Sequence, residues 1–253
     1  MRNLSAPVAI LFCATLPAVA EWQVESSTNE AAAAPAIIHR HVDLADASTG
    51  ESAIVDLALF STKSCKLRVI DNAGGANNLS DTMRRTNCVA GVNGGYFDPN
   101  FAPLGLRIVD GKTTAKLAHG RLMSGIFSSN GSIQLLRLAE FPRAKKVSAA
   151  VECGPFLVDL AKPVRGLEGT RGARRTFIAI GSGDRAALGS CSDVSLADLG
   201  RILATPLGDF KIQRALNLDG GSSSAFWFKR AEGSALSISE YKSVRDFVGI
   251  VPR

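Results

Sequence analysis

Residues 217–226 read NLDGGSSSAF, and residues 92–98 read VNGGYFD. In each stretch a strand-forming run ends in a polar side chain and a pair of glycines. Paired glycines let the backbone approach a ligand closely and leave amide N–H groups that can face anionic oxygens. Each stretch alone has an ordinary alternative, because Asp219-Gly220 can form a hairpin turn and Gly94-Gly95 a bulge. Since both contain an Asn, a Gly-Gly pair and an Asp, we interpret them as two loops of one site for phosphate or sugar chemistry.

Runs of strand composition are spread along the chain on both sides of these two loops. They cover residues 54–60, 66–71, 88–92, 105–109, 122–128, 132–136, 149–152, 156–158, 176–180, 215–218, 225–228 and 247–251. Asp110-Gly111 and Asn130-Gly131 are typical of hairpin turns. The chain is therefore predicted to be rich in short strands.

Two helices are expected to interrupt the strands, one over residues 79–85 and one after Ser195. Ser195 and Asp198 resemble a capping box with an acid in the Glu position, and apolar residues follow at helical spacing. Each helix runs directly toward a glycine loop, which favours helices packed on a sheet with the loops gathered at one edge. The predicted fold class is α+β, with a mixed, largely antiparallel sheet core and a few packed helices in a single domain.

The N-terminus has the features of an export signal. Arg2 supplies positive charge, residues 7–16 are mostly apolar, and Ala18-Val19-Ala20 offers a small-residue cleavage site. We expect a signal peptide over 1–20, a flexible leader over 21–36 and one folded domain over 37–253. No segment reaches the roughly 18 to 20 apolar residues needed to span a bilayer. A periplasmic or secreted protein without a stable membrane span is predicted, with a retained, uncleaved anchor as the alternative.

Cleavage after residue 20 leaves four cysteines in a compartment that permits disulfides. The pairs Cys65–Cys88 and Cys153–Cys191 are favoured because nearest neighbours close the shortest loops; four buried thiols are the alternative. No CxxC or Cys/His ligand spacing appears, which counts against a structural zinc site.

The formal net charge of +6 favours anionic substrates or envelope polymers as partners. Lys and Arg are scattered rather than interleaved with aromatic residues, so nucleic-acid binding is not expected. The sequence contains no indication of oligomeric state.

Four segments resemble the phosphodiester glycosidase domain family, found in bacterial envelope proteins and in the lysosomal pathway. They are VNGGYFDPNFAPLGLRIVDGK at 92–112, ECGPFLV at 152–158, RRTFIAIG at 174–181 and LNLDGGSSSAFW at 216–227. Together with the helix at 195–204, they occur in the family's order. The resemblance implies hydrolysis of a glycosyl phosphodiester to a free sugar and a phosphomonoester. Two departures are Ser222, where the family often has a third glycine, and Cys153 in place of a small residue.

The resemblance also implies the site residues. It carries over three catalytic candidates, Asp219, Asp98 and Arg175, and the substrate-binding set Asn93, Gly94, Gly95, Gly220, Gly221 and Ser222. A glycosyl phosphodiester already has a good leaving group at its anomeric carbon, so the enzyme mainly has to neutralise phosphate charge and stabilise an oxocarbenium-like transition state.

Each candidate has a proposed role and an ordinary alternative. Asp219 is expected to act as nucleophile or as base for water, with Asp98 as a second carboxylate or merely a turn residue before Pro99. Arg175 and the amides of residues 220–222 are expected to hold the phosphate, unless Arg175 forms a surface ion pair. Asn93 either holds a sugar hydroxyl, orients the carboxylate or closes its own Asx-turn.

Three other functions stay open. Ser222, Ser223 and Ser224 could supply a hydrolase nucleophile with a histidine base, but they lack the GxSxG context, and His39 and His41 lie in a predicted edge strand. Asp98 and Asp219 could hold calcium or magnesium in a metal-assisted phosphodiesterase, although no ligand spacing indicates a cofactor. A non-catalytic polysaccharide-binding protein would keep the loops for recognition only. The identity of the sugar, the anomer and the phosphate acceptor is not determined by the sequence.

Overall fold

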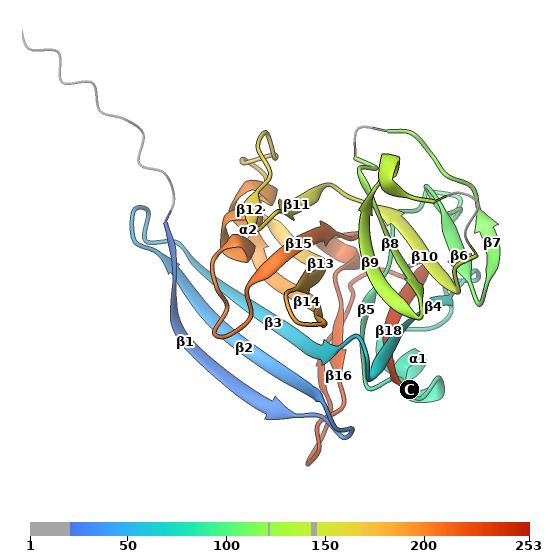
Figure 1. Cartoon of the computed structure of the whole chain (residues 1–253), viewed down its shortest axis with the longest axis horizontal. Helices are drawn as coiled ribbons and strands as arrows, with labels where there is room; N and C mark the ends of the chain where they lie inside the picture. Colours follow the sequence, from blue (N-terminus) through green and yellow to red (C-terminus); the bar gives the residue numbers. More distant parts are fainter. Residues whose placement is uncertain (1–20, 121, 143–145) are drawn as a thin grey trace, which may run out of the picture.

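The computed structural model of the chain describes residues 21–120, 122–142 and 146–253 (Figure 1). The predicted signal peptide over 1–20 lies outside these residues. The strands form three sheets that contain about half of the described residues, and every strand pair within them is antiparallel. The predicted, largely antiparallel sheet core with a few helices is confirmed. The mixed sheet and the α+β class are wrong, because all three sheets are antiparallel and strands far outnumber helices among the described residues.

The largest sheet has eight strands in the order β1-β2-β3-β14-β13-β15-β11-β12. They are β1 (Trp22–Ala31), β2 (Ile37–Asp46), β3 (Ser52–Ser61), β11 (Phe156–Asp159), β12 (Lys162–Pro163), β13 (Ala173–Gly181), β14 (Arg185–Val194) and β15 (Ile212–Asn217). The predicted flexible leader is wrong for Trp22–Ala31, since β1 pairs with β2 along most of its length. Its polar composition suits an edge strand that is mostly exposed to solvent.

The two smaller sheets have five strands each. One has the order β7-β6-β10-β8-β9 and contains β6 (Arg107–Val109), β7 (Lys112–Ala115), β8 (Gly125–Asn130), β9 (Ser132–Arg137) and β10 (Ala149–Cys153). The other has the order β17-β16-β5-β18-β4 and contains β4 (Cys65–Asp71), β5 (Ala90–Asn93), β16 (Phe226–Phe228), β17 (Leu236–Ile238) and β18 (Asp246–Pro252). The two predicted hairpins are confirmed, because Asp110-Gly111 joins β6 to β7 and Asn130-Gly131 joins β8 to β9. Val92, Phe127 and Ile178, one from each sheet, belong to one buried cluster.

The helices are short and lie where they were predicted. In α2 (Leu196–Ala204), the Ser195 side chain accepts a hydrogen bond from the Asp198 N–H at 3.1 Å, which confirms the expected cap. The apolar face of α2 packs on β11, β12 and β15 of the large sheet. The other helix, α1 (Leu79–Arg85), packs on β5 and β16, and two single 3₁₀ turns cover Leu138–Glu140 and Gly221–Ser223. Neither helix is long and apolar enough to cross a membrane, and none other is present in the described residues.

The predicted disulfides are absent from the structure. Cys65, Cys88, Cys153 and Cys191 are buried free thiols, as the alternative prediction has it. Cys65 and Cys153 lie in one core cluster, whereas Cys191 and Cys88 lie in two others. Proximity in sequence failed as a guide because the sheets carry cysteines that are neighbours along the chain into separate parts of the core. Burial raises the pKa of the Cys153 and Cys191 thiols to about 12.

Candidate active site

The two glycine-bearing loops lie side by side at the ends of β5 and β15. The backbone N–H of Asp219 donates to the Gly94 carbonyl at 3.0 Å, and the Asn93 side-chain amide donates to the Asp219 carbonyl at 2.7 Å. Asn93 and Asp219 are far apart in the sequence, so these bonds form only in the folded chain. The expectation that the loops meet at one edge of the sheets is confirmed.

Asn93 is fully buried and uses both side-chain polar atoms inside the protein. Its Oδ1 accepts from the Thr176 hydroxyl at 2.8 Å and from the Ala225 N–H at 3.0 Å, while its Nδ2 holds Asp219. Because the side chain is fully buried, with its oxygen accepting two hydrogen bonds and its nitrogen donating one, it is not available to a sugar hydroxyl. Of the roles expected for Asn93, the geometry favours orienting the Asp219 loop.

Asp219 is the partly exposed carboxyl at this junction. Its Oδ1 accepts a hydrogen bond from the Gly220 N–H at 2.9 Å. Desolvation, helped by the nearby charge of Asp246, raises the pKa of Asp219 from 3.8 to about 6, although hydrogen bonds from Ser223 and Gly220 oppose the change. A carboxyl that titrates near neutrality in a site is suited to acid, base or nucleophilic chemistry.

The first loop rests on a buried ion pair that the sequence analysis did not identify. Arg107 Nη1 lies 2.5 Å from Asp246 Oδ2, and both side chains are almost completely buried. The Gly94 N–H donates to the Asp246 carbonyl at 2.8 Å, and the Gly95 N–H donates to Asp246 Oδ1 at 3.1 Å. These two amides are therefore not free for a ligand.

Residue 94 must be a glycine because Asp246 packs directly against its Cα. A Cβ there would lie 1.7 Å from Asp246 Oδ1, which no side chain tolerates. On Gly95 a Cβ would lie 2.8 Å from Val151 Cγ1. This glycine pair lets the loop pack on Asp246 and Arg107.

The second loop keeps amides available. Among the described residues, the Gly221 and Ser222 N–H groups at the start of the 3₁₀ turn donate to no protein acceptor. Gly221 has a φ of +64°, which favours glycine, and the Gly220 N–H is already bound to Asp219. The Ser222 carbonyl accepts from the Tyr241 N–H at 2.8 Å, so the carbonyl side of the loop is held from behind.

Arg175 lies on β13 beside Gly220 and is nearly buried. Its Nε donates to the Val194 carbonyl at 2.9 Å, and its Nη2 donates to the Arg171 carbonyl at 2.7 Å. No carboxylate pairs with it in the part of the chain that the structure describes, which rules out a surface ion pair there. The remaining nitrogen, Nη1, lies 3.9 Å from where a Gly220 Cβ would stand. Since Nε and Nη2 already donate to backbone carbonyls, only Nη1 of Arg175 is without a partner for the phosphate contact expected from the sequence.

Asp98 has the geometry of a turn residue. Its Oδ1 accepts from the Ala102 N–H at 2.9 Å, and its backbone N–H donates to the Ala102 carbonyl at 2.9 Å. Phe101 also donates to the Asp98 carbonyl, so the hydrogen bonds of Asp98 stay within one turn. The structural alternative for Asp98 thus has direct support.

Several supporting residues had no sequence signal strong enough to identify them. Asp246 is a lone aspartate at the start of β18, and its pKa is raised mainly by burial. Tyr96 and Arg107 lie inside the segment 92–112, yet nothing in the pattern separates them from core residues. The Tyr96 hydroxyl donates to the Gly154 carbonyl at 2.7 Å and accepts from Asn217 Nδ2 at 3.0 Å.

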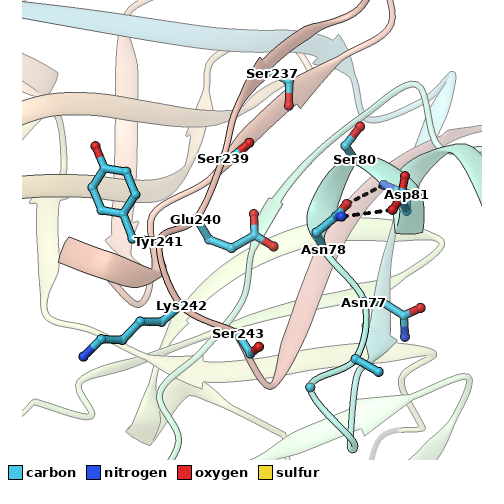
Figure 2. A pocket seen from close by; sticks show the side chains of 12 residues that line it. Asn77, Asn78, Ser80, Asp81, Ser237, Ser239, Glu240, Tyr241, Lys242 and Ser243 are labelled. Carbon is cyan, nitrogen blue, oxygen red and sulfur yellow. Dashed lines mark hydrogen bonds between the residues drawn. The ribbon is translucent and has the colours of Figure 1, made fainter.

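A cavity of about 520 Å³ adjoins the second loop (Figure 2). Glu240 points toward Asn78 across this cavity, whereas the Tyr241 and Lys242 side chains point away from it. Tyr241 instead faces Arg174, whose guanidinium carbon stands 3.9 Å from its ring centre. The candidate residues of the two glycine loops do not line the cavity, so it is a neighbour of the site and not its centre.

Comparison with known proteins gives one family and several relatives. A family model described as phosphodiester glycosidase matches residues 86–251, a span that contains all four of the segments quoted above. The uncharacterized protein YigE of Escherichia coli (strain K12) is 33% identical over 89 residues, which are 32% of this chain and 35% of that protein. The chain thus matches about a third of the length of this relative.

Two solved structures share the fold. The zebrafish N-acetylglucosamine-1-phosphodiester alpha-N-acetylglucosaminidase catalytic domain, auto-inhibited by its pro-peptide, has a TM-score of 0.65 and 16% identity, and the match covers 93% of this chain and 89% of that chain. A hypothetical protein from Synechocystis has a TM-score of 0.63 and 14% identity, with 86% and 62% covered. At these identities the likeness is one of fold.

Proposed function

The chain belongs to the phosphodiester glycosidase family, and we propose that it hydrolyses a glycosyl phosphodiester to a free sugar and a phosphomonoester. The observation that carries the proposal is the meeting of the two loops. There, a carboxyl with a pKa raised to about 6 lies next to unbonded amides and a nearly buried guanidinium. This combination suits a substrate with an anomeric carbon and an anionic leaving group.

In this proposal Asp219 works at the anomeric carbon in its ionised form, as nucleophile or as base for water. Phosphate leaves readily, so little proton donation is needed and the carboxylate form is the active one. Asn93 fixes the backbone of Asp219 through the 2.7 Å hydrogen bond. Asp246 does not react, because its two oxygens already serve Gly95 and Arg107. Asp98 shapes its turn.

The phosphate is held by the N–H groups of Gly221 and Ser222 and by Arg175 Nη1. Two backbone carbonyls already hold the Arg175 fork, so this cation is preorganised and loses little freedom when an anion binds. Gly220 contributes indirectly, because its N–H orients Asp219. Gly94 and Gly95 contribute by letting the first loop pack on Asp246.

We further propose that the enzyme is exported and acts on an envelope or extracellular glycosyl phosphate. The N-terminal sequence pattern supports export, and the net charge of +6 suits an anionic polymer. The roles proposed for Asp219, Arg175 and the loop amides do not require a bound metal.

The proposal is tested by assaying α- and β-linked sugar 1-phosphodiesters and quantifying both the free sugar and the phosphomonoester. For Asp219→Asn we expect a loss of kcat of about 10²–10⁴-fold. For Arg175→Ala we expect a loss of kcat/KM of about 10²–10³-fold. Asp209→Asn is a matched control, since Asp209 is an exposed carboxylate that pairs with Arg40 and Arg185 and not with the glycine loops.

Turnover unchanged in both site variants, each folded normally, would remove the catalytic assignment. Glycan binding by the wild-type protein with no product from any substrate would select the non-catalytic alternative. Activity lost in a chelator and restored by calcium or magnesium would select the metal-assisted one.

A further inference from the structure

His39, His41 and Asp56 form a cluster on the large sheet, away from the glycine loops. His39 and His41 are two positions apart on β2, so their side chains lie on the same face of the strand. Asp56 on β3 is the direct cross-strand partner of His41. The prediction that these histidines lie in an edge strand is wrong, because β1 pairs with the other side of β2.

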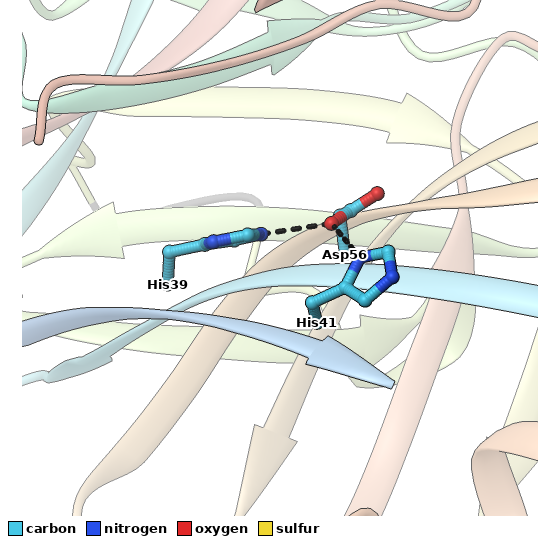
Figure 3. Close-up of side chains that lie close together, drawn as sticks. All are labelled: His39, His41 and Asp56. Atoms are coloured by element: carbon cyan, nitrogen blue, oxygen red, sulfur yellow. Dashed lines mark hydrogen bonds and ion pairs between the residues drawn. The ribbon is translucent and has the colours of Figure 1, made fainter. Parts of the chain in front are cut away.

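One oxygen of Asp56 lies within hydrogen-bonding distance of both imidazole rings. Asp56 Oδ1 lies 2.8 Å from His39 Nε2 and 2.9 Å from His41 Nδ1. Figure 3 shows this oxygen between the two rings, with the other Asp56 oxygen pointing away. Asp56 and His39 are buried, whereas the His41 side chain is 36% exposed.

The second nitrogen of each ring also faces a carboxylate. His39 Nδ1 lies 3.4 Å from Glu30 Oε2, and His41 Nε2 lies 3.4 Å from Asp43 Oδ1. Histidines that ligate a metal commonly bind a carboxylate through their other nitrogen, which fixes the tautomer and makes the ligand more basic. Two histidines with this arrangement converge here on one acidic oxygen.

We propose that His39, His41 and Asp56 bind one divalent first-row transition ion, of which zinc fits the donor set best. Two imidazole nitrogens and one carboxylate oxygen are typical zinc ligands, and the three donor atoms lie within 4.8 Å of one another. Around a tetrahedral ion with bonds of about 2.0–2.1 Å, ligand atoms stand about 3.4 Å apart. The distances of 2.8 and 2.9 Å from Asp56 Oδ1 to the two ring nitrogens must each lengthen by roughly 0.5 Å to reach that spacing.

A cavity lies beside the cluster. A cavity of about 290 Å³ is lined by His41 and Asp56 together with Ile54, Arg174 and Ile238, so there is open space beside two of the three proposed ligands. The Arg174 guanidinium in that lining is engaged by the carbonyls of Ser224 and Ser239 and by the Tyr241 ring.

The ion joins β2 to β3 through three protein ligands and leaves one coordination position open. It is independent of the proposed hydrolysis, so either can fail alone. The sequence offered no hint of this site, since the third ligand comes from the neighbouring strand.

The experiment is a zinc titration of the metal-stripped full-length protein by calorimetry in a non-chelating buffer at pH 7.5. We expect one ion per chain with micromolar or tighter affinity, and an absorption band typical of tetrahedral cobalt when Co²⁺ replaces zinc. His41→Gln, at a partly exposed position that tolerates the change, should weaken zinc binding about 100-fold or more, and Asp43→Asn about 10-fold. Zinc should also raise the Tm of the wild-type protein but not of His41→Gln.

His119→Gln is the matched control, because His119 lies outside the cluster. It should bind zinc as the wild-type protein does. If zinc binds with the same affinity to His41→Gln, or if the wild-type protein binds no zinc at millimolar concentration, the site does not exist. In that case the cluster is a hydrogen-bonded triad without metal.

Discussion

Replacing Asp219 by Asn should stabilise the folded protein at pH 7 while removing turnover. The pKa of Asp219 is raised from 3.8 to about 6, chiefly by burial. At 1.36 kcal/mol per pH unit, ionising this carboxyl in the folded protein costs about 3 kcal/mol more than in the unfolded chain. An amide has no charge to bury, and its oxygen can still accept the hydrogen bond from Gly220.

The direction of the pH dependence of this stability difference follows from the raised pKa of Asp219. A carboxyl with a folded-state pKa above its unfolded value contributes its full stability below pH 3.8 and loses it as the pH rises through about 6. The advantage of Asp219→Asn should therefore be near zero at pH 3.5. It should grow between pH 4 and 6 and approach about 3 kcal/mol at pH 7.

The assay is urea denaturation of wild-type protein and variant at several pH values between 3.5 and 7.5, at constant ionic strength. Asp209→Asn is a control of opposite sign, since Arg185 and Arg40 lower the pKa of Asp209 to about 2. Its stability contribution is present above pH 3.8 and lost as the pH falls through about 2, so that variant should be destabilised at pH 7. The side chain is largely exposed, and the effect should be small.

Two results would refute the reasoning. One is a stability difference for Asp219→Asn that does not change with pH, and the other is a loss of stability at pH 7. In the active enzyme the same titration should appear as kcat/KM rising through pH about 6, because the ionised carboxylate is the proposed reacting form.

Three further predictions concern residues that support the site. Asn93→Ala should lower the free energy of unfolding by about 3 kcal/mol, because it removes two buried hydrogen bonds and one partly buried one. It should also reduce kcat more than it raises KM, and equal effects on both constants would contradict the positioning role. Gly94→Ala should cost more than about 4 kcal/mol because its Cβ would meet Asp246, whereas Gly74→Ala, with open space around it, should cost under about 1 kcal/mol; chemical denaturation compares the two, and similar costs would refute the packing argument. In a mature chain unfolded without reductant, a thiol reagent should titrate four cysteines, and a smaller number would reveal disulfides.

Much of the strand layout could be predicted from composition and turns. The segments 54–60, 66–71 and 132–136 correspond to β3, β4 and β9, whose bounds differ from the prediction by one or two residues. β14 was missed, since Arg185–Val194 is rich in small residues and lacks the aromatic residues that mark a strand. Its place in the sheet comes from pairing with β13 and β3, and strand preference depends on such neighbours.

The sequence by itself determined the two glycine loops, the order of the family segments and the helix cap at Ser195, because each depends on residues close together in the chain. The tertiary structure decided which polar groups meet. It packed Asp246 against Gly94, paired His41 with Asp56 and placed the two members of each predicted cysteine pair in different core clusters. It also set the pKa of Asp219, since desolvation depends on the atoms that surround a carboxyl in space, and these come from strands far apart in the sequence.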